Sequence, residues 1–194
     1  MKLILLTLIS LFSLPALSAD APIISIMETE GKVTLASKDG KIHWGDKISG
    51  EPGSKLRARI SYQSWVLIGP FKASFEKSDA EGKVIGLLRL EEGQSRIQIQ
   101  IGSQAHAVPT VRTPSAVMGV RGTDFFASYN PLLGESEIIS FENDIEFQSV
   151  QTSSHVVVHT GQWGGIGGRF GNTIQPPMQL PENVIKHFKD KFIK

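Results

Sequence analysis

Five histidines are the side chains of this sequence best suited to bind a metal ion. His155 and His159 are four residues apart, which is a ligand spacing on a helix, but they flank a Val-Val-Val run typical of a strand. Four strand residues span about 13 Å, so one ion could not contact both rings. His43, His106 and His187 lie in unrelated segments. We therefore expect strand histidines that face solvent, and neither a metal nor another cofactor.

Motifs for hydrolysis or nucleotide binding do not emerge from the remaining residues. The sequence has neither a G-x-S-x-G elbow nor an H-E-x-x-H zinc motif, and cysteine is absent, which excludes thiol nucleophiles and thiolate metal sites. The "GGIGGRFG" segment resembles a phosphate loop, but "NTIQPP" follows it, and two prolines oppose the helix that such a loop requires. The sequence therefore predicts a protein that is not an enzyme.

Three tryptophans are weak candidates for ligand binding: Trp44, Trp65 and Trp163. An indole ring can stack on a sugar or a peptide when one face is open to solvent. Trp163 lies in the Gly-rich segment, where the alternative is that it closes one end of the core.

The N-terminal segment has the pattern of a secretory signal peptide. Lys2 precedes an uncharged apolar stretch, Leu3–Leu14, which is shorter than the roughly 20 residues of a spanning helix. Cleavage is expected after Ala19, with Ser18 and Ala21 as alternatives. The expected location is the periplasm, and the alternative is a secreted or outer-membrane-associated protein.

Length and charge limit the class further. The 194 residues suffice for one domain with a genuine core, and 40% of them are hydrophobic. Removal of residues 1–19 leaves 19 basic and 19 acidic residues, so the mature chain is formally neutral. No global basic field is present to attract nucleic acid, and a nucleic-acid partner is not expected.

Short strands with turn residues between them predict an all-β architecture from Ile23 onward. In "LRARISYQSWVLI", Leu56, Ala58 and Ile60 alternate with polar residues, as a half-buried strand requires. The "EEGQ" sequence predicts a tight turn, and residues 74–82 predict a polar loop or a single helical turn.

The last part of the chain changes character. Residues 163–180 are rich in Gly and Pro and predict an irregular connector, while residues 181–194 predict a short amphipathic helix. Pro181 suits a helix start, and Ile185, Phe188 and Phe192 share one stripe. We expect this stripe to dock on the β-core; the alternative is weak contact with a membrane surface.

The segment "RTPSAVMGVRGTDF" predicts a structural joint. Pro114 belongs at a strand edge or bend, because it lacks a backbone donor. Gly122 permits a bulge, which would allow both Phe125 and Phe126 to find apolar surroundings. Arg121 then needs acceptors such as Asp124.

This segment resembles the signature of the FecR domain family, in which a Thr-Pro pair precedes Val-Arg-Gly-Thr, a polar residue and Phe. The matching residues are Thr113, Pro114, Val120, Arg121, Gly122, Thr123 and Phe125. An upstream "GKVTL", a "GDKI" and a late "HVVVHTGQ" agree with the family pattern, so the resemblance covers about residues 24–162.

The resemblance implies a FecR-like domain over residues 23–162, with a twisted, solenoid-like stack of short strands; a β-sandwich is the alternative fold. Family regulators receive a signal from an outer-membrane transporter and relay it to a sigma factor. The sequence shows no internal spanning segment, so we expect this chain to differ from those regulators and to have no cytoplasmic segment. We therefore expect a standalone exported protein that binds an envelope protein partner, with a role in envelope signalling. The alternative is a structural, peptidoglycan-binding or glycan-binding envelope protein.

Overall fold

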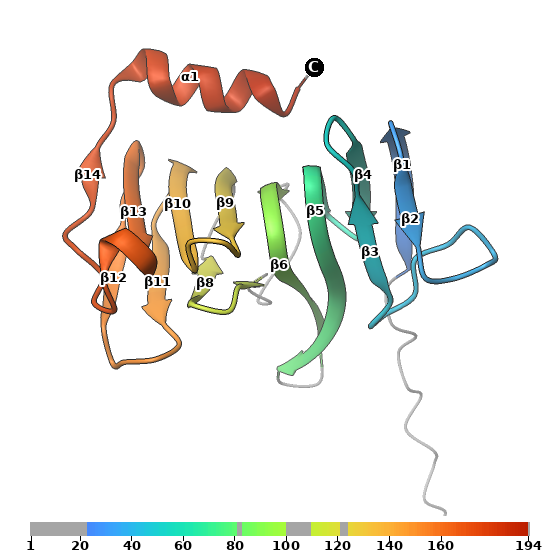
Figure 1. Ribbon diagram of the computed structural model, residues 1–194, viewed down its shortest axis with the longest axis horizontal. Coiled ribbons are helices and arrows are strands. Elements are labelled where there is room, and N and C mark those ends of the chain that lie inside the picture. Colours follow the sequence, from blue (N-terminus) through green and yellow to red (C-terminus); the bar gives the residue numbers. More distant parts are fainter. Residues whose placement is uncertain (1–22, 81–82, 100–109, 121–123, 194) are drawn as a thin grey trace, which may run out of the picture.

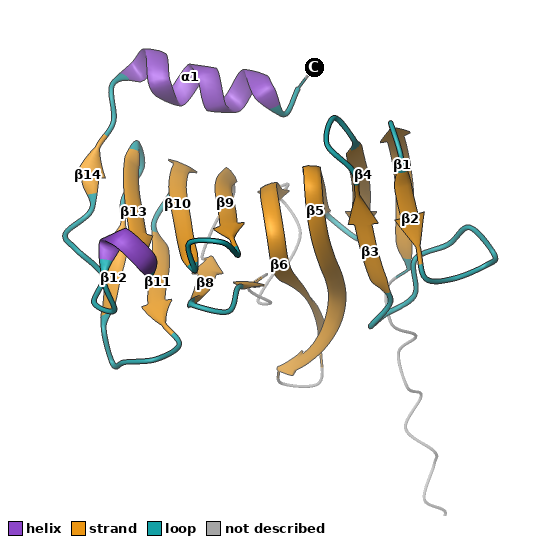
Figure 2. Cartoon of the chain, in the orientation of Figure 1, coloured by secondary structure: helices purple, strands orange, loops and turns teal. Residues whose placement is uncertain are grey.

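The computed structural model describes residues 23–80, 83–99, 110–120 and 124–193. The expected signal peptide, residues 1–19, lies outside this part of the chain. Strands dominate the described residues, with one α-helix near the C-terminus (Figure 2), which confirms the all-β fold with a short C-terminal helix. The elements are β1 (Ile24–Glu30), β2 (Val33–Leu35), β3 (Lys47–Gly50), β4 (Lys55–Ile60), β5 (Gln63–Ala80), β6 (Lys83–Ile99), β7 (Thr110–Arg112), β8 (Ala116–Val120), β9 (Asp124–Asn130), β10 (Glu135–Glu142), β11 (Ile145–Ser149), β12 (His155–Val158), β13 (Gln162–Ile166), η1 (Gly168–Phe170), β14 (Met178–Gln179) and α1 (Glu182–Lys191).

The fourteen strands of the described residues join one curled sheet around the long β5–β6 hairpin (Figure 1). The open end and the turn end of this hairpin belong to different layers of the curled sheet. The first half of β5 pairs with β4, which pairs with β1. The second half of β6 pairs with β9, and the sheet continues through β10 and β13 to β14. We call this the helix-side layer. The second half of β5 pairs with β3, which pairs with β2. The first half of β6 pairs with β7, and the sheet continues through β8 and β11 to β12. We call these strands the far layer.

The main core lies between the two layers. Side chains that point inward alternate along each strand with side chains that point outward, as pleated strands require. In β4, the expected inward residues Leu56, Ala58 and Ile60 are all buried, whereas Arg59 is exposed. Far-layer residues such as Met118 and Phe147 belong to the same core cluster.

A second, smaller core covers the outer surface of the helix-side layer. Helix α1 runs across the strands rather than along them (Figure 1). The sheet contributes Val66, Phe126, Ile139 and Phe141 to this cluster, and the helix side contributes the buried Phe192. Ile185 and Phe188 pack against it, so the stripe expected from the sequence docks on the β-core.

Three sequence expectations differ from the structure. Residues 74–80 continue strand β5 and form neither a loop nor a helical turn. The "EEGQ" sequence lies inside β6, where the register shifts: Lys72 pairs with Glu92 and Ala73 with Leu90. Gly93, with φ of +104°, accommodates this bend. The glycine expected in a turn therefore lies at a kink within a continuous strand. The expected irregular connector contributes β13, η1 and β14.

Candidate functional site

The Thr-Pro pair of the sequence signature forms the turn between β7 and β8. Thr113 is buried, its backbone N–H donates to Ala116 O at 2.9 Å, and its hydroxyl accepts from Ala116 N at 2.9 Å. The Ser136 hydroxyl of β10 lies 2.6 Å from the hydroxyls of both Thr113 and Ser115. Pro114 is exposed at the bend, as its missing donor requires. The hydroxyls of Thr113 and Ser115 therefore connect this far-layer turn to Ser136 of the helix-side layer.

Phe125 and Phe126 are both buried in apolar surroundings, whereas the bulge expected at Gly122 lies outside the described residues and stays a prediction. Phe125 points into the main core and Phe126 points outward beneath α1, so they alternate as on a regular strand. Phe126 lies 5.0 Å from Phe188 between ring centroids. The observed bulge lies on the partner strand, where Phe141 is the extra residue between Ser140 and Glu142.

Asp124 pairs with an arginine that the sequence did not suggest. Arg96 donates to both carboxylate oxygens of Asp124, at 2.8 Å from Nε and 2.6 Å from Nη2. Arg121, Gly122 and Thr123 lie outside the described residues, so their proposed role as a joint stays a prediction. The backbone of Val120 ends strand β8 and pairs with Ile145 of β11.

The three tryptophans occupy different environments. Trp65 is fully buried and packs edge-on against Phe75 at 5.6 Å, so it contributes to the core and offers no open face. Trp44 is half-buried against the same core. Trp163 is half-buried on the outer surface and packs edge-on against Phe170 at 5.2 Å. Only Trp163 borders one of the cavities described below.

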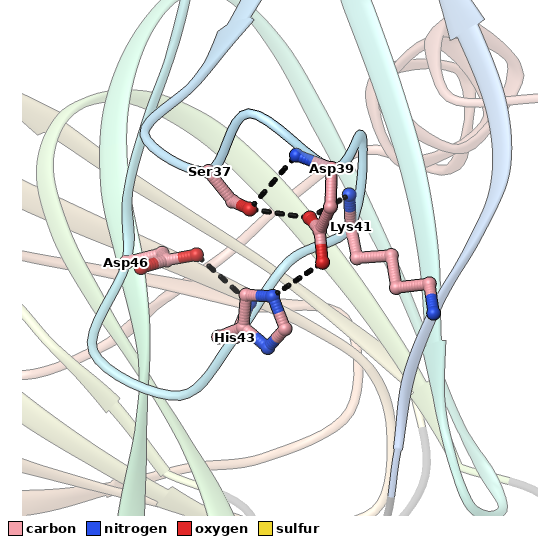
Figure 3. Close-up of polar contacts among 5 residues, drawn as sticks. All are labelled: Ser37, Asp39, Lys41, His43 and Asp46. Atoms are coloured by element: carbon pink, nitrogen blue, oxygen red, sulfur yellow. Dashed lines mark hydrogen bonds and ion pairs between the residues drawn. The ribbon is translucent and has the colours of Figure 1, made fainter.

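The loop between β2 and β3 holds a polar cluster with the residue types of a hydrolytic triad (Figure 3). The Ser37 hydroxyl donates to the Asp39 carboxylate, whose other oxygen lies 3.0 Å from Nε2 of His43. The backbone N–H of Lys41 also donates to the Asp39 carboxylate. The hydrogen bond from Ser37 and, next in strength, that from Lys41 hold the pKa of Asp39 well below its usual range. Asp46 accepts from the His43 backbone. Because Ser37 donates to Asp39 and not to His43, the cluster pins an exposed loop and does not activate a nucleophile.

Metal ligands do not converge in the part of the chain that the structure describes. No group of three or more His, Asp or Glu side chains there could hold an ion. His155 and His159 both lie on or beside the exposed strand β12, and His159 Nδ1 lies 2.8 Å from Asp144 Oδ1. His106 lies outside the described residues.

A groove lies beside α1 on the helix-side layer. It consists of two cavities, of about 390 and 260 Å³, that share Glu137. The larger cavity extends to Lys191 at the C-terminal end of α1, and the smaller reaches Val184 near its start. We call the two cavities together the α1 groove. Glu137 could not be singled out from the sequence, because a lone glutamate on a strand resembles any solvated residue.

Two crystal structures from Parabacteroides distasonis, at 1.65 and 2.50 Å resolution, share this fold. Each matches with a TM-score of 0.59 and 12% sequence identity over 74% of this chain. The chain spans 64% and 63% of the length of the chains in those two structures, which is less than two thirds. They are provisionally described as anti-sigma factors. At this identity, the likeness establishes the fold.

No protein-family model and no curated protein matches the chain. Within the described residues, no helix has the length and apolar character needed to cross a membrane.

Proposed function

We propose that this chain contains an exported FecR-like domain that acts by binding a protein partner in envelope signalling. The observation that carries the proposal is the two-layer curled sheet, which the chain shares with proteins provisionally described as anti-sigma factors. The Val-Arg-Gly-Thr signature supports it, because this sequence connects β8 of the far layer with β9 of the helix-side layer. On this view the domain is a non-enzymatic regulator, and its Thr-Pro turn and aromatic residues hold the scaffold.

The proposed location is the periplasm. A basic residue, a short apolar stretch and small residues at the N-terminus support export with cleavage after Ala19. The intact mass of the protein purified from an envelope fraction tests this. We expect a mass that lacks residues 1–19; a mass for the whole of residues 1–194 would contradict cleavage.

In-cell photocrosslinking followed by mass spectrometry tests the proposed function. Probes belong in the β2–β3 loop, at Lys38–Lys41, and in the β9–β10 turn, Asn130–Glu135, where residues 130–133 are exposed. We expect capture of a signalling protein of the envelope, such as a transporter's signalling domain or an inner-membrane sensor. Crosslinks only to the cell wall, to porins or to copies of this chain would contradict signalling and favour a structural role.

A further inference from the structure

We propose that the α1 groove is the partner-binding site, and that it receives a peptide segment with an apolar side chain next to a lysine or arginine. The apolar side chain enters the smaller cavity, and the basic side chain pairs with Glu137. This inference rests on the proposed function, since it names the surface and the partner chemistry for that function.

Strand register places the floor of the groove. Ile68 pairs with Gln94, Gln94 with Ser128, and Ser128 with Glu137, so these residues form one row across four strands. The neighbouring row contains Phe126 and lies beneath α1. The first row therefore runs alongside the helix. The larger cavity opens over all four of its residues, and the smaller cavity borders it only at Glu137.

The smaller cavity is apolar except for one group. Its walls include Phe126, Ile139, Trp163, Met178 and Phe188, and Glu137 is the single polar residue that lines it. Its volume of about 260 Å³ is below the roughly 300–1,000 Å³ of small-molecule sites. The cavity therefore suits one apolar side chain of a larger partner, and Met178, 56% exposed, lies at its open rim.

Glu137 provides the charge at the point where the cavities meet. Its carboxylate accepts a hydrogen bond from Ser128 Oγ at 3.3 Å, and it joins none of the ion pairs formed among the described residues. Lys191, which lines the larger cavity, donates to the side chain of Gln94 at 2.5 Å. A half-buried carboxylate beside an apolar wall gains a charge-assisted hydrogen bond from a basic partner group.

A glycan fits this surface less well. Sugar recognition requires several polar groups around a stacking ring, whereas the cavity beside Trp163 offers one carboxylate and otherwise apolar walls. The edge of Trp163 also packs against Phe170, which fixes its ring in the apolar wall. A peptide therefore matches the chemistry of the groove better than a sugar.

An array of synthetic 12-residue peptides is the probe for this proposal. One set carries Leu or Phe next to Arg, a second replaces Arg by Glu, and a third replaces the apolar residue by Ser. We expect the purified protein to bind the first set selectively. Equal signals from all three sets, or no signal, would overturn the proposal.

Fluorescence anisotropy with the strongest peptide then compares two matched variants. Glu137→Gln should weaken binding about tenfold. Glu146→Gln, at an exposed glutamate on strand β11 of the far layer, should leave the dissociation constant unchanged. Equal affinities for wild type and Glu137→Gln would place the peptide elsewhere and overturn the proposal.

Two further outcomes would also overturn it. One is sedimentation of the wild-type protein, but not Trp163→Ala, with purified peptidoglycan. The other is a dimer that Glu137→Gln dissociates, which would make a second copy the occupant. Failure of this proposal can be distinguished from failure of the proposed function. If the Glu137→Gln variant still captures a signalling partner in cells, the proposed function holds and only the α1 groove is excluded as the binding site.

Discussion

The carboxylate of Asp124 on β9 accepts two hydrogen bonds from the guanidinium of Arg96 on β6, with about 5% of the arginine side chain and 7% of the aspartate side chain exposed. The same guanidinium donates from Nη1 to the backbone carbonyl of Lys189 in α1 at 3.0 Å. Its Cζ also lies 5.3 Å from the centroid of the Phe141 ring. Arg96 therefore connects the sheet to the C-terminal end of the helix, where free carbonyls favour a cation.

Removing one member of this pair should cost more than removing both. Arg96→Met leaves the buried Asp124 carboxylate without its partner, and we expect a loss of about 3–5 kcal/mol in unfolding free energy. The double variant Arg96→Met/Asp124→Leu should recover a large part of this loss. Urea unfolding of both single variants and the double variant gives the coupling. Additive losses would show that the two groups do not depend on each other.

Truncation after Gln179 should lower the thermal stability of the domain. It removes Phe188 and Phe192 and uncovers Phe126, and each of these aromatic side chains contributes to the second core. Calorimetry gives the change in Tm, and dye binding reports the uncovered apolar surface. An unchanged Tm together with a loss of protein from membrane fractions would instead identify the helix as a membrane contact.

Gly93 should tolerate no side chain, unlike Gly134 in the β9–β10 turn. Both have positive φ, of +104° and +66°, but a Cβ at Gly93 would lie 2.4 Å from Pro70 O, whereas a Cβ at Gly134 meets nothing within 4 Å. We expect Gly134→Ala to cost about 1 kcal/mol from backbone strain alone, and Gly93→Ala to cost more than about 3 kcal/mol. Chemical unfolding of the two variants tests the difference, and equal losses would contradict the close approach.

The Glu76–Arg89 pair should make stability sensitive to acid. Hydrogen bonding by Arg89 lowers the pKa of Glu76 from its ordinary value of 4.5, so the unfolded chain binds a proton more readily than the folded chain. The pair therefore stabilises the fold above pH 4.5, and this contribution is lost as the pH falls through the lower folded pKa. The decrease in Tm between pH 7 and pH 3 should be smaller for Glu76→Gln than for the wild-type protein. Parallel decreases would contradict this role, because other carboxylates contribute equally to both proteins.

The sequence predicts the parts of this fold that depend on local pattern. Alternation in β4 identifies inward residues, and the apolar stripe with Pro181 before it identifies α1, because both signals repeat over short distances. The full length of β5 and β6 was not predicted, because the last part of β5 and the middle of β6 are polar and resemble a loop and a turn. Tertiary pairing overrides that local preference and places Gly93 in a kink.

The candidate site depends on contacts between distant residues, which local patterns do not encode. Arg96 and Asp124 are 28 residues apart, and nothing in the sequence selects this partner over Arg121. The α1 groove combines residues of β9, β10, β13 and the helix, so it exists only after these elements assemble. Phe126 shows the same limit, because its burial depends on a helix more than 50 residues later.

Site-specific photocrosslinking at two exposed residues tests most directly whether this domain binds a protein partner through the α1 groove. Met178 lies at the rim of the groove, and Val157, on the edge strand β12, is the matched position away from it; their exposed fractions are 56% and 41%. With a photoreactive residue at each position in living cells, we predict capture of an envelope signalling protein at Met178 and none at Val157. Equal capture at both positions, or capture of cell-wall material and porins alone, would contradict the account.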